Sequence, residues 1–89
     1  MGFQKTIREI SDKKFFIAIQ PPLTKEEMEA LQMGVLEYFK LINEFALAGK
    51  MGQRGGISYF VISTPYPWPG FKKAVELGLK KGLKELNKI

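Results

Sequence analysis

The order of apolar and polar residues predicts three β-strands separated by turns and helices. Residues 3–9 alternate imperfectly between apolar and polar side chains, which indicates a first strand. Residues 14–20 are aromatic and β-branched with little alternation, which is typical of a strand covered on both faces or buried centrally. Residues 57–63 form the third predicted strand. A turn-like segment at 11–13 separates the first two strands, and two prolines end the second.

A helix start at Thr24 is the clearest local signal in the chain. Thr24 and Glu27 have the spacing of a capping box, in which each side chain accepts a hydrogen bond from the other residue's backbone N–H. Leu23 and Met28 flank the cap and can form a hydrophobic staple. Apolar residues then recur at helical spacing to Ala48, and the glycine that follows can end a helix. We therefore predict a helix from Thr24 to Ala48.

This predicted helix has more apolar surface than a small sheet covers. Its main stripe faces the core and comprises Met28, Leu31, Val35, Tyr38, Phe39, Ile42, Phe45 and Ala46. Met33, Leu36 and Leu47 lie outside the stripe. We expect these three residues to form an interface with another copy of the chain. Partial exposure of scattered apolar side chains is the alternative.

Residues 71–88 predict a second amphipathic helix, entered through a proline-rich aromatic turn at 64–70. Gly78 and Gly82 lie at the centre of its apolar side. Each glycine costs about 1 kcal/mol relative to alanine inside a helix. We therefore expect the backbone of this helix to approach the sheet or another helix closely.

The order of these elements predicts an α+β fold in a single domain over residues 1–89. The expected architecture is a small mixed three-stranded sheet with two helices packed on one face. The helix between the second and third strands indicates a right-handed βαβ crossover, which makes those two strands parallel. Three strands make a thin sheet, so we expect dimerisation to complete it.

The composition removes most of the common routes to catalysis and metal binding. The 89 residues include no histidine and no cysteine, and Asp12 is the only aspartate. Ser58 and Ser63 lie in a predicted strand without a histidine to activate them. Glu26 and Glu27 are explained by helix capping and the helix dipole. We expect a non-catalytic protein without a metal or another cofactor.

The same composition bears on the cellular compartment. No apolar run approaches the roughly 20 residues that a membrane span needs, and no secretory signal is recognisable. The absence of cysteine is compatible with a reducing compartment. We expect a cytoplasmic protein without a membrane span. Many lysines and glutamates indicate a thermophilic source, whereas four methionines argue against it.

The net charge of +5 is distributed unevenly along the chain. Residues 24–48 are acidic in balance, whereas residues 71–89 are basic. A basic surface can attract phosphates or acidic partners, and the alternative is solvation together with helix-dipole complementarity. Lys72 and Lys73 lie in the first turn of the second helix, where they oppose the dipole. They are therefore better binding candidates than the later lysines.

Residues 49–56 (GKMGQRGG) predict a flexible loop in which Lys50 and Arg54 stand among glycines. Bare glycine amides and two cations suit phosphate contact. The loop is not a P-loop, because it follows a helix and contains no Gly-Lys-Ser/Thr. Residues 52–55 (GQRG) resemble the GXXG loop of KH domains, which contacts a nucleic-acid backbone. That family requires a helix after the loop, and a strand is predicted here. The alternative is a helix stop followed by a return to the sheet.

The turn at 64–70 (TPYPWPG) is the third candidate site. Its prolines restrict the backbone, so Tyr66 and Trp68 would be presented for stacking on bases or for anchoring a partner. The alternative is that Trp68 covers the core and that Pro69 occupies the first helical position.

These observations favour a small non-catalytic basic module that contacts nucleic acid or ribonucleoprotein. The candidate contact residues are Lys50, Arg54, Lys72 and Lys73 for phosphates, and Tyr66 and Trp68 for stacking. The alternative is a homo-oligomeric protein-interaction or scaffold module that associates through Met33, Leu36 and Leu47.

Overall fold

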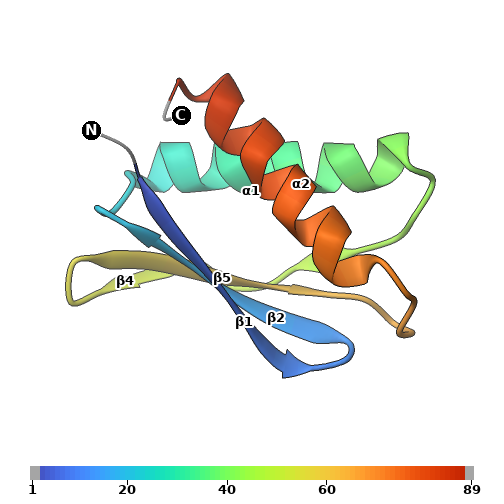
Figure 1. Ribbon diagram of the computed structural model, residues 1–89. Helices are drawn as coiled ribbons and strands as arrows, with labels where there is room; N and C mark the ends of the chain where they lie inside the picture. Colours follow the sequence, from blue (N-terminus) through green and yellow to red (C-terminus); the bar gives the residue numbers. More distant parts are fainter. Residues whose placement is uncertain (1–2, 88–89) are drawn as a thin grey trace.

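The computed structural model describes residues 3–87 and shows two helices on one side of an antiparallel sheet (Figure 1). The elements are β1 (Gln4–Ser11), β2 (Lys14–Gln20), α1 (Lys25–Leu41), β3 (Leu47–Ala48), β4 (Gly52–Arg54), β5 (Ile57–Ser63) and α2 (Phe71–Glu85). The sheet order is β1-β2-β5-β3, and β4 also pairs with β5. The predicted α+β class and the placement of both helices on one face are confirmed.

The prediction of a mixed three-stranded sheet is wrong, because the sheet has five strands and every pairing is antiparallel. The segment predicted as a flexible loop contains β4 and a tight hairpin. Gly55 and Gly56 form its two-residue turn with φ of 59° and 78°, as a type I′ turn requires. This hairpin reverses the chain before β5, so β5 runs antiparallel to β2. The expected parallel βαβ crossover therefore does not form.

Helix α1 begins as predicted and ends earlier than predicted. The Thr24 N–H donates to Glu27 Oε1 at 2.9 Å, and the Glu27 N–H donates to Thr24 Oγ1 at 3.1 Å, so the capping box is confirmed. The helix ends at Leu41, and Asn43 takes a left-handed conformation with φ of 60°. Asparagine adopts this conformation more readily than most residues. The predicted continuation to Ala48 is wrong, because the chain instead turns back to pair with β5.

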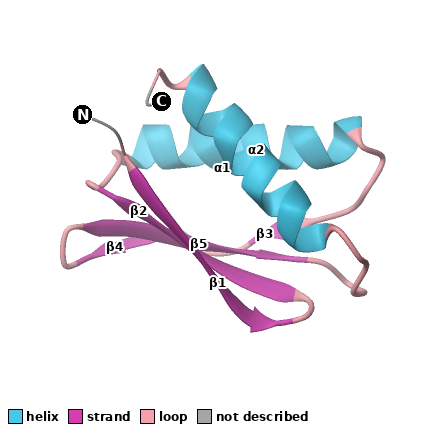
Figure 2. Ribbon diagram, in the orientation of Figure 1, coloured by secondary structure: helices cyan, strands magenta, loops and turns pink. Residues whose placement is uncertain are grey.

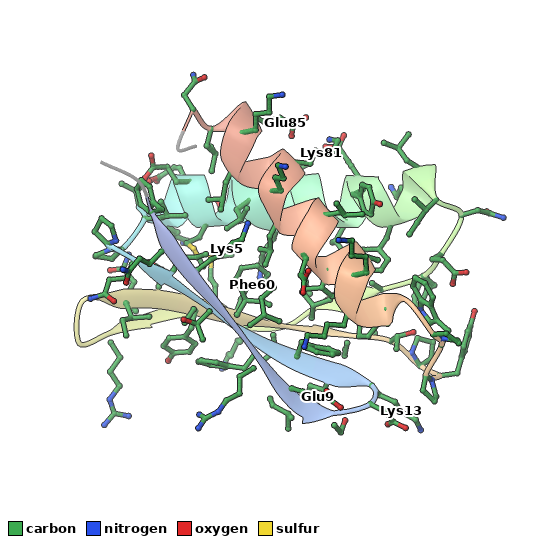
Figure 3. All side chains as sticks on the ribbon, viewed as in Figure 1. Lys5, Glu9, Lys13, Phe60, Lys81 and Glu85 are labelled. Carbon is green, nitrogen blue, oxygen red and sulfur yellow. The ribbon has the colours of Figure 1, made fainter. Side chains whose placement is uncertain are left out.

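The core lies between the sheet and the two helices, where Phe60 is fully buried (Figure 3). Alternate residues of β2 and β5 face the helices, as one-sided burial of a strand requires. The buried sheet residues are Phe15, Ile17, Ile19, Ser58, Phe60 and Ile62. The helices contribute Met28, Leu31, Val35, Phe39, Phe71, Ala74, Val75, Leu79 and Leu83. Of the two alternatives predicted for residues 14–20, covering on both faces is wrong, because β2 lies inside the sheet between β1 and β5 but is buried on one face.

The two helices cross over the sheet (Figure 2). Glycines form the contact at the crossing. A Cβ atom on Gly82 would lie 2.7 Å from Leu31 Cδ1 and 3.2 Å from the Leu31 carbonyl oxygen. A Cβ atom on Gly34 would lie 3.0 Å from the Gly82 Cα. A Cβ atom on Gly78 would lie 3.2 Å from Val35 Cγ1. The predicted close approach of the second helix is therefore confirmed, and α1 is the element that it approaches.

Replacing a glycine at this crossing is expected to separate the helices. Gly82→Val should lower the free energy of unfolding by about 1–3 kcal/mol, because its side chain overpacks the contact with Leu31. Lys84→Val is the matched control, because it puts the same side chain on an exposed position of α2. The measurement is urea unfolding of both variants and the wild type. Equal destabilisation by the two substitutions would contradict a steric role for Gly82.

Candidate functional site

The face of the sheet opposite the helices carries side chains that no element covers in the described part of the chain (Figure 2). Side chains opposite one another in neighbouring antiparallel strands point to the same face. The register therefore assigns to this face Gln4, Thr6, Arg8, Lys14, Phe16, Ala18, Gln20, Leu47, Gly52, Arg54, Ile57, Tyr59, Val61 and Ser63. We call this surface the open sheet face.

Two stacked aromatic rings lie at the centre of the open sheet face. Phe16 of β2 and Tyr59 of β5 are diagonal neighbours across the strand pair. Their ring centroids lie 5.6 Å apart, and the ring planes differ by 28°. Both side chains are half-buried and line a shallow hollow with Ala18, Arg54 and Ile57. The face therefore offers a preorganised aromatic surface in contact with solvent.

A glycine in the neighbouring strand makes room for the tyrosine ring. Gly52 of β4 lies opposite Tyr59. A Cβ atom on Gly52 would lie 2.6 Å from the Tyr59 hydroxyl oxygen and 2.7 Å from Tyr59 Cζ. The ring therefore reaches across the backbone of β4 at this point, and any larger residue would displace it. An aromatic side chain that covers a glycine in this way also compensates for the missing side chain of the edge strand.

All the charged residues on the open sheet face are basic. Arg8 lies directly opposite Phe16 in the register, and Lys14 precedes Phe16 by two residues on the same face. Arg54 lines the aromatic hollow. Glu9 is opposite the buried Phe15 and belongs to the helix side of the sheet. Among the described residues, the aromatic pair thus has basic neighbours and no carboxylate on the same face.

The structure separates the basic residues that the sequence singled out. Arg54 lies on the open sheet face, and Lys50 is exposed on the connection between β3 and β4. Lys72 and Lys73 lie on α2, in the helix layer, where they line a separate hollow with Lys5 beside β1. Three of the four candidates therefore lie outside the open sheet face.

The two aromatic candidates of the 64–70 turn differ in exposure. Tyr66 is 55% exposed. Trp68 packs against Phe39 with centroids 6.4 Å apart and against Phe71 with centroids 5.9 Å apart. Its buried Nε1 has no hydrogen-bond partner among the described residues. Trp68 therefore covers the end of the core, as the alternative interpretation had it. The expectation for Pro69 is wrong, because Gly70 is the N-cap and the helix begins at Phe71.

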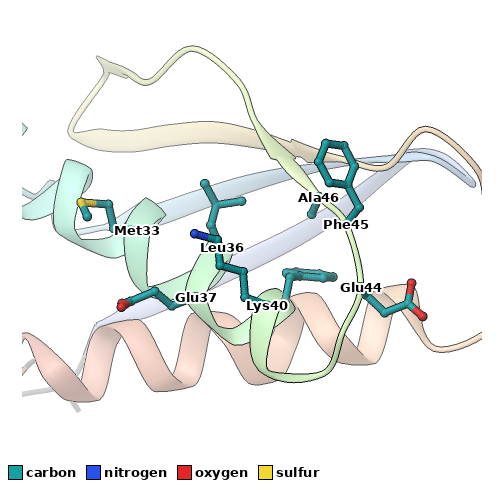
Figure 4. Close-up of a pocket in the computed structure, with 8 residues that line it drawn as sticks. Met33, Leu36, Glu37, Lys40, Glu44, Phe45 and Ala46 are labelled. Atoms are coloured by element: carbon teal, nitrogen blue, oxygen red, sulfur yellow. The ribbon is translucent and has the colours of Figure 1, made fainter.

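The predicted interface residues fall in two places. Met33 and Leu36 line an apolar hollow between α1 and the chain that follows it, together with Phe45 and Ala46 (Figure 4). Met33 is 64% exposed, so this hollow opens to solvent. Leu47 lies on β3 opposite Ser63, which places it on the open sheet face. Only Met33 and Leu36 of the three predicted residues therefore line this hollow.

The polar groups of the interior serve the fold. The buried Ser58 Oγ accepts a hydrogen bond from the Leu23 N–H at 2.8 Å. The Gln53 side-chain amide donates to the Leu23 carbonyl oxygen and to Ser58 Oγ. These bonds attach the start of α1 to the β4–β5 hairpin. The Ser58 hydroxyl thus bonds both to the Leu23 backbone and to the Gln53 side chain.

Two further observations concern ionisable groups of the described residues. Residues 3–87 contain no group of three or more acidic, histidine or cysteine side chains placed to hold a metal ion. Lys81 Nζ lies 2.8 Å from the Glu85 carboxylate, and this hydrogen bond raises the pKa of the lysine. The pair occupies successive turns of an exposed part of α2, where it is an ordinary helix-surface interaction.

Sequence reasoning missed Phe16, Tyr59, Arg8 and Lys14. In β2, the inward Phe15, Ile17 and Ile19 alternate with outward residues that are also apolar, so the period of two was hidden. The alternation in β5 is likewise masked by Tyr59 and its apolar neighbours. The available signal was the pair of glycines before β5, which predicts a hairpin and hence an antiparallel partner.

Comparison with known proteins identifies no relative of this chain. Neither known protein families, nor curated proteins, nor solved structures give a match to this chain. Within the part of the chain that the structure describes, no helix is long and apolar enough to cross a membrane. Function is therefore inferred from the chemistry of the surface itself.

Substituting Gly52 is expected to displace the tyrosine from the aromatic pair. Gly52→Val places side-chain atoms where the Tyr59 ring lies, so the ring must rotate away from Phe16. We expect changes in the aromatic proton chemical shifts of Phe16 and Tyr59 in NMR spectra. Gly49→Val is the control, because a Cβ atom there meets Val61 at an ordinary distance of 3.5 Å. Unchanged aromatic shifts in the Gly52 variant would contradict the packing of the Tyr59 ring over Gly52.

Proposed function

We propose that the open sheet face binds single-stranded nucleic acid. The observation that carries this proposal is the stacked Phe16–Tyr59 pair on a face whose charged residues are all basic. Exposed aromatic rings stack on bases, and each stacked base contributes about 1–3 kcal/mol by alanine substitution. Basic side chains around the rings attract the phosphates that connect those bases.

A single strand suits this surface better than a duplex. Stacking requires the flat face of a base, and in a duplex these faces are occupied by neighbouring base pairs. The same physics operates in RNA-recognition motifs, where aromatic residues on a sheet stack two or three bases. The analogy concerns the chemistry of the surface, because a fold class alone does not imply a function.

The basic residues have distinct expected roles in this proposal. Arg8, Lys14 and Arg54 are placed to contact phosphates on either side of the aromatic pair. The exposed Lys50, on the adjoining β3–β4 edge, would extend this contact. Lys72 and Lys73 lie in the helix layer, so they would add only long-range attraction.

A protein-interaction module is the second candidate function. It is favoured by the apolar hollow of Met33, Leu36 and Phe45, which opens to solvent away from the core. Large apolar side chains gathered at a surface are typical of contact sites. The two functions differ in their dependence on salt, because only the nucleic-acid contact releases condensed counterions.

Removing the aromatic rings should weaken binding of single strands. Phe16→Leu and Tyr59→Leu keep apolar bulk on the face while they abolish base stacking. We expect each to raise the Kd for a fluorescein-labelled 12-nucleotide oligo(dT) or oligo(rU) by roughly fivefold or more, measured by fluorescence anisotropy. A labelled duplex of equal length should bind more weakly than either single strand.

Tyr66→Leu is the matched control for the aromatic variants, because Tyr66 is an exposed tyrosine outside the sheet. Its substitution should leave the Kd nearly unchanged. Loss of affinity in the Tyr66 variant, with wild-type affinity in the Tyr59 variant, would move the site to the 64–70 turn. Absence of binding by the wild-type protein at low salt would refute the proposal.

Removing a cation from the open sheet face should reduce the salt dependence of binding. Arg8→Gln and Arg54→Gln should each lower the slope of log K against log [salt] by about 0.7, the value for one phosphate contact on a single strand. Lys40→Gln on α1 removes the same charge from the opposite layer, and its slope should stay at the wild-type value. An equal decrease in all three variants would indicate non-specific attraction by net charge.

A further inference from the structure

Strand β1 is a long edge strand with one unpaired side. Seven of its eight residues have a partner in β2, and no other strand of residues 3–87 pairs with it. Nearly all of its side chains are exposed. The backbone N–H and C=O groups of such an edge are available to another strand.

The charges along β1 fit a second copy of β1 itself. If two copies run antiparallel with Ile7 opposite Ile7, Lys5 of each copy lies opposite Glu9 of the other. Both residues are on the helix side of the sheet, because Lys5 is opposite the buried Ile19 and Glu9 is opposite the buried Phe15. Opposite charges in directly facing positions stabilise a strand pair. We propose that the chain forms a twofold dimer through this β1–β1 pairing.

Neighbouring registers lack this complementarity. A shift by one residue would put the helix side of one copy on the same side as the open face of the other, which a twofold axis perpendicular to the sheet does not allow. The next register on one side sets Arg8 opposite Arg8, and like charges in facing positions destabilise a strand pair. The next register on the other side sets Lys5 opposite Ile7. Only the register centred on Ile7 places both Lys5 and Glu9 opposite a residue of opposite charge.

The charges around Lys5 also favour a negative group at this position. Lys5 lines the hollow beside β1 with Lys72, Lys73 and Lys80, and Glu76 is the only acidic residue in that lining. Lys5 and Glu9 lie toward opposite ends of β1 (Figure 3). In the proposed pairing, Glu9 of the second copy lies opposite Lys5, at the border of this hollow. The dimer would balance positive charge that the single chain leaves in excess there.

The dimer would also enlarge the open sheet face. An antiparallel pairing of identical edges has its twofold axis perpendicular to the sheet, so the helices of both copies lie on one side. The open faces then join across β1, and Arg8 of each copy lies opposite Thr6 of the other. This inference stands on the edge strand alone and does not depend on nucleic-acid binding.

Charge reversal tests the register. Lys5→Glu and Glu9→Lys should each weaken the dimer roughly tenfold or more, since each puts like charges in two symmetric facing positions. The double variant Lys5→Glu/Glu9→Lys restores opposite charges and should recover the wild-type dimer Kd. Sedimentation equilibrium from low micromolar to submillimolar concentration measures each Kd. Lys13→Glu, in the β1–β2 turn, is the control with the same change in net charge as Lys5→Glu.

A cysteine variant tests the geometry independently. The chain has no cysteine, so Ile7→Cys provides a single thiol at the proposed twofold axis. Facing residues of an antiparallel pair have Cα atoms about 4.5–5.5 Å apart, within the range of a disulfide. Mild oxidation should link Ile7→Cys into a covalent dimer. Met33→Cys places a more exposed thiol at the α1 hollow and should crosslink more slowly.

Several outcomes would overturn the inference. A single-chain mass at every concentration would show that the edge is protected instead of paired. A dimer that resists both charge reversals, or that the double variant fails to restore, would reject the register. Faster crosslinking of Met33→Cys would move the interface to the α1 hollow. Each result is independent of oligonucleotide binding, so failure of the dimer and failure of the proposed function are distinguishable.

Discussion

The close crossing of α1 and α2 is the contact on which the rest of the structure depends. Gly34, Gly78 and Gly82 bring the two helix backbones together, so that both helices fit over one face of a narrow sheet. Their apolar stripes then enclose a single core with β2 and β5. Each helical glycine lowers helix propensity, and close packing at the crossing offsets this cost. The consequence is that the other face of the sheet has no helix to cover it.

The uncovered face and the unpaired edge of β1 follow from this one-sided arrangement. Phe16 and Tyr59 occupy positions that a helix would bury in a three-layer fold, and here they remain in contact with solvent. Gly52 allows the Tyr59 ring to lie across the neighbouring strand. The same sheet ends at β1, whose facing charges suit a second copy. The two proposals concern different surfaces, and both can hold for one protein because pairing at the edge leaves the open face accessible.

Much of the local structure could be predicted from the residues themselves. The limits of β2 and β5, the capping box at Thr24 and the turn after Ser11 agree with the structure, because each depends on contacts between residues near one another in the chain. Of the candidate site, Arg54 was identified, whereas the aromatic pair was not. Phe16 and Tyr59 are 43 positions apart and meet only through the β2–β5 pairing. Apolar residues on both sides of β2 also concealed which side was buried.

The sequence by itself determined the class of fold, the helix starts and the existence of a glycine contact on α2, since propensity, capping and periodicity are local properties. The tertiary structure alone decided the direction of β5, the early end of α1 and the choice of the exposed face. The Gly55–Gly56 turn reverses the chain locally, but its effect on the sheet depends on β5 inserting between β2 and the β3–β4 edge. The choice among these non-local pairings depends on how much apolar surface the whole chain buries. No single segment contains that information.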